Sequence, residues 1–214
     1  MELLEFYERL LAFYGAQSWW PAQTPFEVMA GAVLTQGTSW KNVEKAISNL
    51  NKLSLLSPDS IRYTSDEELA DVIRPCGFYM VKTQRLKNLM DWLQRYDDNL
   101  AKLACKETST LRRELLEVKG IGKETADTIL LYALGRPVFV IDAYTRRILE
   151  RLGIGPTNAS YDELQEFFEG NLPPDPQLFN EFHALIVKLG KDACTKRPLC
   201  LRCPLGNTCP FYQS

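Results

Sequence analysis

The sequence lacks several features that would place it in a membrane or secreted class. None of its uninterrupted apolar stretches is long enough to cross a bilayer. Its first residues, MELLEFYERLLAFYG, predict an acidic amphipathic helix, whereas a signal peptide needs a basic start followed by an apolar run. We therefore expect a cytoplasmic protein that does not interact with a membrane.

Strand-like segments are also scarce. GRPVFVID is the only short stretch with strand character, and no pair of alternating segments flanks a hairpin turn. Apolar residues recur instead at helical spacing, as in PFEVMAGAVLTQ, KTQRLKNLMDWLQRY and LFNEFHALIVKLG. The sequence therefore predicts an all-α fold of about ten helices joined by short loops.

There is no excess of positive charge. The chain has 25 Lys and Arg against 27 Asp and Glu, with a net charge of −2. This balance argues weakly against nucleic-acid binding, because phosphate contacts need Lys and Arg, although a basic face can lie on an acidic body. Basic residues do cluster, and each cluster is either a solvated helix face or part of a binding surface. The clusters are Lys82, Arg85 and Lys87; Lys119 and Lys123; Arg146, Arg147 and Arg151; and Lys188, Lys191, Lys196 and Arg197.

Four of the six cysteines lie close together near the end of the chain. They are Cys194, Cys200, Cys203 and Cys209, with the spacing C-x5-C-x2-C-x5-C. Four thiolates in one loop can wrap a soft metal centre, and by this chemistry an iron–sulfur cluster and a zinc ion are equally possible. Disulfides are disfavoured in a cytoplasmic protein. Cys76 and Cys105 lie far away, and we expect them to be ordinary buried residues.

The segment LLEVKGIGKETADTILLYAL predicts two helices joined by a tight turn at Gly120-Ile121-Gly122. Such a turn leaves backbone N–H groups at the start of the second helix, where they can bind a phosphate. A Gly-x-Gly sequence is often a simple turn. Here Lys119 and Lys123 flank it, which favours contact with a DNA backbone without base readout.

Asp142 follows an apolar run and opens the helix AYTRRILERLG. Its side chain is expected to cap that helix. A carboxylate at this position could also stabilise positive charge on a sugar or activate a water molecule, and the two roles are compatible.

These three signals, in this order, resemble the helix-hairpin-helix DNA glycosylases of the endonuclease III superfamily. AVLTQGTSW and GFYMVKTQRLKNL extend the resemblance over almost the whole chain, and WWP, IRPCGFY and GIGKETAD are most similar to the 3-methyladenine DNA glycosylase III branch. The resemblance implies a six-helix barrel domain over 21–136, with the hairpin at about 111–134, and a second helical domain made of 1–20 and 137–214. It also assigns a [4Fe–4S] cluster to the four cysteines of the loop at 194–209, although the first gap has five residues where the family usually has six.

The resemblance further implies that the chain is a monomer whose partner is double-stranded DNA containing damaged bases. In a prokaryote such a protein would be associated with the nucleoid. Asp142 corresponds to the catalytic aspartate, and Gln36 and Phe78 to the side chains that fill the space left by a flipped base. The expected DNA contacts are Gly120, Gly122, Lys123, Lys196 and Arg197. The expected base pocket is Trp19, Trp20 and Trp40, which could instead be core aromatics. The single histidine, His183, is expected to be structural.

One departure from the family is informative. Bifunctional members carry a lysine directly before the Thr-Ala of the hairpin motif, and its amine attacks the sugar. This chain has Glu124 at that position, and Lys123 one residue earlier points in another direction on the helix. The sequence therefore predicts a monofunctional glycosylase without AP lyase activity, acting on alkylated purines such as 3-methyladenine and 7-methylguanine. An adenine-mismatch activity is disfavoured because Ala32 replaces that branch's glutamate. A glycosylase for pyrimidines and an inactive binder of damaged DNA are the alternatives.

Overall fold

The computed structural model describes residues 1–213, and all regular structure in this range is helical. The predicted all-α class is confirmed. Thirteen α-helices occur in the described range where about ten were expected, because several short helices lack a full apolar stripe. GRPVFVID forms no strand and has no regular secondary structure in the described range. No helix in that range is long and apolar enough to span a membrane.

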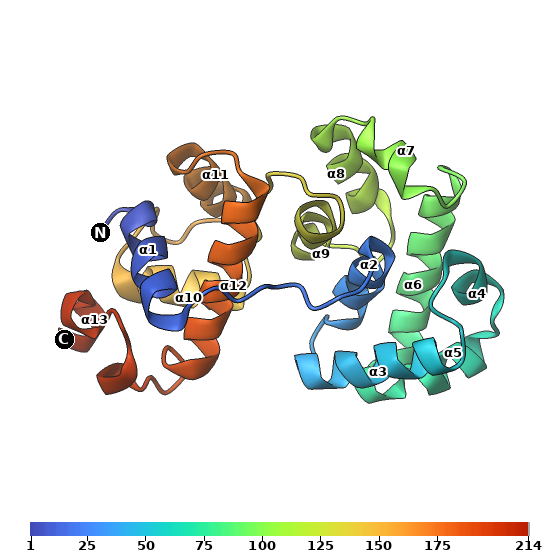
Figure 1. The fold of residues 1–214 in the computed structure, drawn as a ribbon, viewed down its shortest axis with the longest axis horizontal. Coiled ribbons are helices and arrows are strands. Elements are labelled where there is room, and N and C mark those ends of the chain that lie inside the picture. Colours follow the sequence, from blue (N-terminus) through green and yellow to red (C-terminus); the bar gives the residue numbers. More distant parts are fainter. Residues whose placement is uncertain (214) are drawn as a thin grey trace. The chain divides into compact units, whose positions relative to one another are not determined.

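The chain divides into two compact units (Figure 1). The central unit comprises residues 22–136 and the terminal unit comprises residues 1–21 and 137–214. The elements of the central unit are α2 (Pro25–Leu34), α3 (Trp40–Lys52), α4 (Pro58–Tyr63), α5 (Asp66–Val72), η1 (Arg74–Cys76), α6 (Tyr79–Gln94), α7 (Leu100–Ala104), α8 (Thr108–Glu117), α9 (Lys123–Thr128) and η2 (Ile129–Ala133). Those of the terminal unit are α1 (Leu3–Tyr14), α10 (Ala143–Leu152), α11 (Tyr161–Asn171), α12 (Pro176–Asp192), η3 (Cys200–Arg202), η4 (Gly206–Thr208) and α13 (Pro210–Gln213).

Most of these helices begin at a residue whose side chain accepts a backbone hydrogen bond from the first turn. Each such cap satisfies one amide that the helix itself leaves unpaired, and it is worth about 1 kcal/mol. The capping residues are Thr24, Ser57, Ser65, Asn99, Asp142, Ser160 and Asp175.

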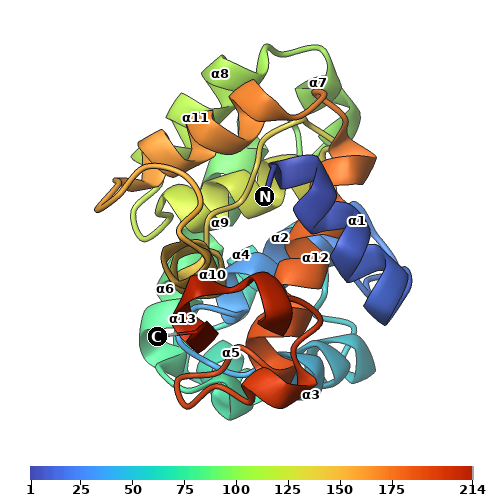
Figure 2. The same cartoon turned by 90° about the vertical axis from the view of Figure 1, so that its left-hand side faces the viewer.

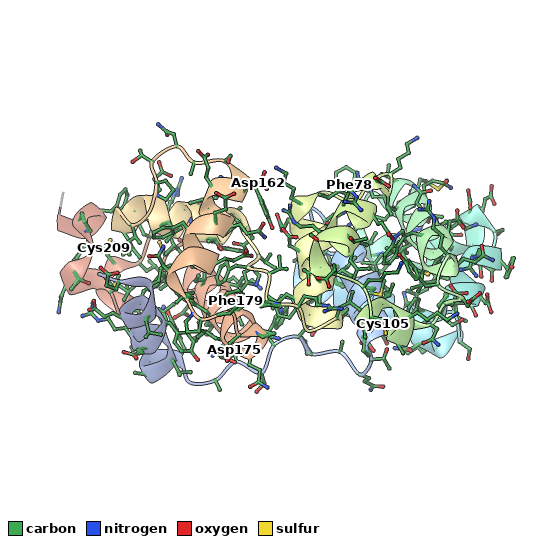
Figure 3. The ribbon with its side chains drawn as sticks, turned by 90° about the horizontal axis from the view of Figure 1, so that it is seen from above. Phe78, Cys105, Asp162, Asp175, Phe179 and Cys209 are labelled. Carbon is green, nitrogen blue, oxygen red and sulfur yellow. The ribbon has the colours of Figure 1, made fainter. Side chains whose placement is uncertain are left out.

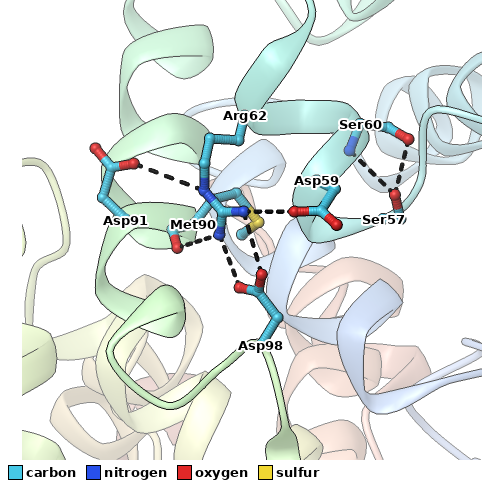
Figure 4. Close-up of polar contacts among 7 residues, drawn as sticks. All are labelled: Ser57, Asp59, Ser60, Arg62, Met90, Asp91 and Asp98. Carbon is cyan, nitrogen blue, oxygen red and sulfur yellow. Dashed lines mark hydrogen bonds and ion pairs between the residues drawn. The ribbon is translucent and has the colours of Figure 1, made fainter.

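Helix α6 is the longest helix of the central unit, and it packs against α4 and α5. An ion-pair network closes this contact (Figure 4). The Arg62 guanidinium on α4 donates to both carboxylate oxygens of Asp98, at 2.7 and 3.1 Å, and to the carbonyl of Met90 on α6, at 2.9 Å. It also pairs with Asp59 at 2.8 Å. Because its side chain is only 9% exposed, Arg62 needs these acceptors to offset its desolvation.

In the terminal unit, α12 packs against both α1 and α10, although α1 comes from the opposite end of the sequence (Figures 1 and 2). Buried phenylalanines fill this core. The rings of Phe139 and Phe168 stack with centroids 3.9 Å apart, and Phe179 and Phe182 meet Phe139 edge-on. Phe6 of α1 meets Phe182 at 5.2 Å, so this core depends on both ends of the chain.

Candidate functional site

Asp142 caps α10 as predicted. Its Oδ1 accepts hydrogen bonds from the backbone N–H of Thr145, at 2.7 Å, and from the Thr145 hydroxyl, at 2.9 Å. The second carboxylate oxygen, Oδ2, lies 3.6 Å from Nε2 of His183 on α12. The carboxylate is mostly enclosed, with its side chain 12% exposed, so one oxygen serves the fold and the other meets an imidazole.

The pKa of Asp142 is lowered by this arrangement. Burial alone would raise the pKa, because it disfavours the charged form. The adjacent His183 imidazole, together with the hydrogen bonds from Thr145, outweighs burial and lowers the pKa below its usual value. Asp142 is therefore held as a carboxylate at neutral pH. His183 was expected to be only structural; its contact with Asp142 depends on the packing of α12 against α10, which no local pattern reveals.

The hairpin between α8 and α9 has the predicted tight turn. Gly120 has φ +94°, a conformation that L side chains rarely adopt, and a Cβ there would collide with the side chain of Arg85. Gly122 precedes α9, whose start is capped by no side chain. Lys123 and Glu124 occupy the first turn and are both exposed.

Gln36 is held against this hairpin. Its side-chain amide donates to the Gly120 carbonyl, at 3.1 Å, and to the Thr125 hydroxyl, at 2.9 Å, while its carbonyl oxygen accepts a hydrogen bond from Arg85. The structure therefore brings Gln36, the turn and Arg85 together. In the sequence Arg85 is only one member of a basic cluster, and no local pattern predicts this contact.

Phe78 lies on the central unit, immediately before α6, and its side chain projects from it (Figure 3). It is 73% exposed and has left-handed backbone angles, φ 48° and ψ 32°. Its neighbours on α6, Met80 and Val81, are about half exposed. An apolar group of this kind in solvent is unfavourable for an isolated protein and is typical of a binding surface.

The three predicted pocket tryptophans do not share a unit. Trp19 and Trp20 belong to the terminal unit, with ring centroids 5.3 Å apart, and Trp40 begins α3 of the central unit. All three are half-buried. The ammonium of Lys191 lies 5.8 Å from the Trp19 ring, and Trp40 donates to Glu44 at 2.9 Å.

The four loop cysteines line one small cavity that is partly open to solvent. Burial raises the pKa of the Cys203 thiol, and the three other cysteines raise it further. Arg151 of α10 also lines the cavity and donates to the Cys194 sulfur at 3.3 Å. Within residues 1–213, no group of three or more His, Cys, Asp or Glu side chains is arranged to hold a metal ion.

The remaining cysteines behave differently from each other. Cys76 is buried as expected, and burial raises the pKa of its thiol to about 11. The expectation of a buried Cys105 was wrong: it follows the short helix α7 and is exposed.

Several basic residues make contacts within the protein instead of lying free on a solvated face. Lys82 is fully buried. Arg146, Arg147 and Arg151 each donate to backbone carbonyls within the terminal unit. A run of cations in the sequence therefore does not imply a charged surface. The basic side chains that the structure leaves exposed near the predicted motifs include Lys119, Lys123, Lys196 and Arg197.

Comparison with known proteins identifies the class to which this fold and these motifs belong. Residues 30–174 match the model of the HhH-GPD superfamily base excision DNA repair proteins. The chain belongs to this superfamily, so the predicted family is confirmed. It is a DNA glycosylase of base excision repair that acts on DNA.

Three relatives place the chain more closely. It is 49% identical over 97% of its length to a Methanocaldococcus jannaschii protein named "Putative DNA repair glycosylase MJ1434", of which the match covers 95%. It is 33% identical in sequence to the Helicobacter pylori 3-methyladenine DNA glycosylase, whose crystal structure contains bound 1,N6-ethenoadenine. The two structures match with a TM-score of 0.79 over 89% of this chain and 98% of that one. It is also 31% identical to the thymine/uracil-DNA glycosylase of Pyrobaculum aerophilum, over 91% of this chain and 84% of that protein.

Proposed function

We propose that the protein is a monofunctional DNA glycosylase that releases alkylated purines, such as 3-methyladenine and 7-methylguanine, and leaves an intact abasic site. The observation that carries this proposal is the pair Glu124 and Asp142. An exposed carboxylate occupies the position where a lyase lysine would stand, while the capping aspartate keeps a lowered pKa. The likeness to a 3-methyladenine DNA glycosylase supports the choice of base.

The proposed mechanism uses water as the nucleophile. Gln36 and Phe78 fill the space that the flipped nucleotide vacates, and Lys123, Lys196, Arg197 and the hairpin backbone contact phosphates. The bond between the base and the sugar breaks, and Asp142 stabilises the positive charge that develops on the sugar. A water molecule guided by Asp142 then adds its oxygen to the sugar and gives its proton to that carboxylate, from which it passes to solvent, because a cationic alkylated base leaves as a neutral molecule.

An alkylated purine suits this chemistry because its bond to the sugar is already weakened by the positive or electron-poor base. Such a base needs no strong general acid. It needs a pocket that stacks on it and attracts positive charge, and tryptophan rings provide both interactions. We assign this role to the adjacent, half-buried rings of Trp19 and Trp20 in the terminal unit. Trp40, in the central unit, stays a prediction from the sequence.

The test is base release from methylated duplex DNA by the purified protein, with chromatography of the freed bases. Strand breaks are scored on the same samples with and without hot alkali. We expect free 3-methyladenine or 7-methylguanine and breaks only after alkali. Asp142→Asn should bind the same DNA and release almost no base, because it keeps the cap but loses the charge. Breaks without alkali, or no methylated base released, would contradict the proposal.

Glu124 can be tested separately by borohydride trapping, which captures an amine bound to the sugar. We expect no trapped complex with the wild-type protein. Glu124→Lys restores an amine at the lyase position and should form a trapped complex, whereas Glu124→Gln, the matched control, should not. Trapping by the wild-type protein would show that another amine attacks the sugar.

The second candidate function is a mismatch-specific glycosylase activity on pyrimidines. The likeness to a thymine/uracil-DNA glycosylase favours it. Duplexes that carry uracil or thymine opposite guanine, assayed beside the methylated DNA, distinguish the two. A protein that binds these DNAs and releases no base from any of them would be a binder of damaged DNA.

We also propose that Cys194, Cys200, Cys203 and Cys209 hold a [4Fe–4S] cluster. All four line one cavity, which the donor chemistry of such a cluster requires. Four cysteine thiolates can also bind zinc, and the test below distinguishes the two metal centres. The cluster would cross-link the loop that carries Lys196 and Arg197.

The cluster proposal is tested on protein purified without oxygen. We expect iron and sulfide in equal amounts, a brown colour, and loss of both in Cys203→Ala. Cys105→Ala is the matched control, because that cysteine is exposed and lies in the other unit. Colourless protein that contains zinc would overturn the assignment.

A further inference from the structure

Lys82 is a buried charge that the mechanism above does not use. It lies in the first turn of α6 and its residue is 0% exposed. Burial lowers the pKa of the Lys82 ammonium, and the nearby Arg85 lowers it further. Burying an amine of this kind costs free energy that an apolar side chain of similar length would avoid. Its contacts therefore call for an explanation other than filling the core.

The Lys82 amine joins two backbone segments. It donates to the carbonyl of Leu34, at 2.9 Å, and to the carbonyl of Cys76, at 2.8 Å. Leu34 is the last residue of α2 and Cys76 is the last residue of η1. Both carbonyls lie at helix ends, where the helix itself supplies no donor.

Each of these carbonyls stands two residues before a side chain that is proposed to enter the DNA. Leu34 precedes Gln36, and Cys76 precedes Phe78. The two loops also touch, because the Phe78 ring comes within 4.0 Å of the position that a Cβ on Gly37 would occupy. One ammonium thus ties together the starting points of both loops.

We propose that Lys82 is a positioning residue that sets the spacing between Gln36 and Phe78, so that both can fill the gap left by one flipped nucleotide. This inference rests on the proposed function of those two side chains. Without the amine, two buried carbonyls lose their donor and the two loops are free to move independently. A displacement of about 1 Å at such a site can lower a rate roughly 100-fold.

The test compares two affinities of the same variant, so that a folding defect cannot imitate a positioning defect. The first ligand is a duplex with a tetrahydrofuran abasic analogue opposite 2-aminopurine, whose fluorescence reports insertion into the gap. The second is an undamaged duplex of the same length, which needs only phosphate contacts. Partial unfolding lowers both affinities equally, whereas misplaced loops lower only the first.

For Lys82→Met we expect roughly a 10- to 100-fold loss of affinity for the abasic duplex, a weaker fluorescence response, and little change with undamaged DNA. Thr83→Val is the matched control. Thr83 is the next residue on α6, is fully buried, and has a hydroxyl without a hydrogen-bond partner, so its removal should leave both affinities unchanged. If Lys82→Met does not fold, the same two affinities are measured for Lys82→Gln, which keeps a hydrogen-bond donor on a shorter, neutral side chain.

A double-mutant cycle then asks whether Lys82 acts through the two inserted side chains. In a Gln36→Ala, Phe78→Ala background, Lys82→Met should have much less effect on abasic-duplex binding than in the wild type. Equal losses for both duplexes, or an undiminished effect in that background, would overturn the inference. None of these assays requires base release, so the inference can fail while the proposed glycosylase activity holds, and the reverse.

Discussion

At the scale of single residues, Asp142 combines a structural and a chemical role. Its Oδ1 caps α10 through Thr145, while Oδ2 faces His183. The cap fixes the carboxylate in one orientation. The imidazole and the hydroxyl keep it ionised despite burial. A capping aspartate thus becomes a group able to stabilise a positive sugar.

The lowered pKa of Asp142 has consequences at acid pH. Its contribution to stability is fully present above the unfolded-state pKa, about 3.9, and is lost as the pH falls through the lower folded-state value. The rate of base release should likewise persist below the usual range of a carboxylate. His183→Asn removes the largest lowering influence, so the acid limb of the pH–rate profile should move to higher pH.

Single-turnover rates of base release across the acid range would check this. Thr145→Val is the control: it removes the hydroxyl bond and leaves the backbone bond, so the limb should shift in the same direction by less. An unchanged limb in His183→Asn would show that the imidazole does not set the state of Asp142.

At the scale of elements, the hairpin between α8 and α9 depends on a packing contact as well as on its turn. Gly120 has a positive φ and lies directly against the Arg85 side chain of α6. Arg85 in turn holds Gln36, which bonds to the Gly120 carbonyl. The turn, α6 and the loop after α2 therefore form one connected arrangement.

Gly120→Ala should be more destabilising than an ordinary glycine substitution in this chain. The backbone conformation alone costs an alanine about 1–3 kcal/mol, and the collision with Arg85 adds to that cost. Gly135→Ala is the control, because Gly135 also has a positive φ, +61°, but has open space around its Cβ position. Urea unfolding would measure both.

The collision can be isolated by adding Arg85→Ala to Gly120→Ala. Stability should partly return, because the clash is gone, but binding to an abasic duplex should not, because Gln36 no longer has Arg85 as a hydrogen-bond donor. Equal losses of stability in Gly120→Ala and Gly135→Ala would show that the contact with Arg85 is unimportant.

At the scale of the whole molecule, the protein has a net charge of −2 and yet acts on DNA, which is a polyanion. Many of its cations make internal contacts, including Lys82 in the core of the central unit and Arg147 and Arg151 against the cysteine loop. We therefore expect the exposed cations near the predicted motifs to supply most of the phosphate contacts.

The salt dependence of DNA binding tests this set. Lys123→Ala and the pair Lys196→Ala, Arg197→Ala should weaken binding to damaged and undamaged duplexes alike. For every phosphate that a variant no longer neutralises, the slope of log affinity against log salt should become shallower by about 0.9. Lys52→Ala, an exposed lysine at the end of α3, is the control and should leave the slope unchanged. A wild-type slope in the Lys123 and Lys196–Arg197 variants would place the phosphate contacts elsewhere.

The sequence by itself determined the helical class, the hairpin turn, the cap at Asp142 and the grouping of four cysteines. Each of these depends on residues close together along the chain, through helical periodicity, glycine conformation, capping geometry or loop spacing. Short helices such as α4 and α7 escaped prediction because they are too short to show a period.

Only the tertiary structure decided which side chains meet across the chain and which charges are buried. Lys82 and Lys123 look alike in sequence, yet one lies in the core bonded to two carbonyls and the other is exposed beside the hairpin. His183 reaches Asp142 only because α12 packs on α10. Burial and long-range contact arise from the packing of whole helices, which is why local patterns do not reveal them.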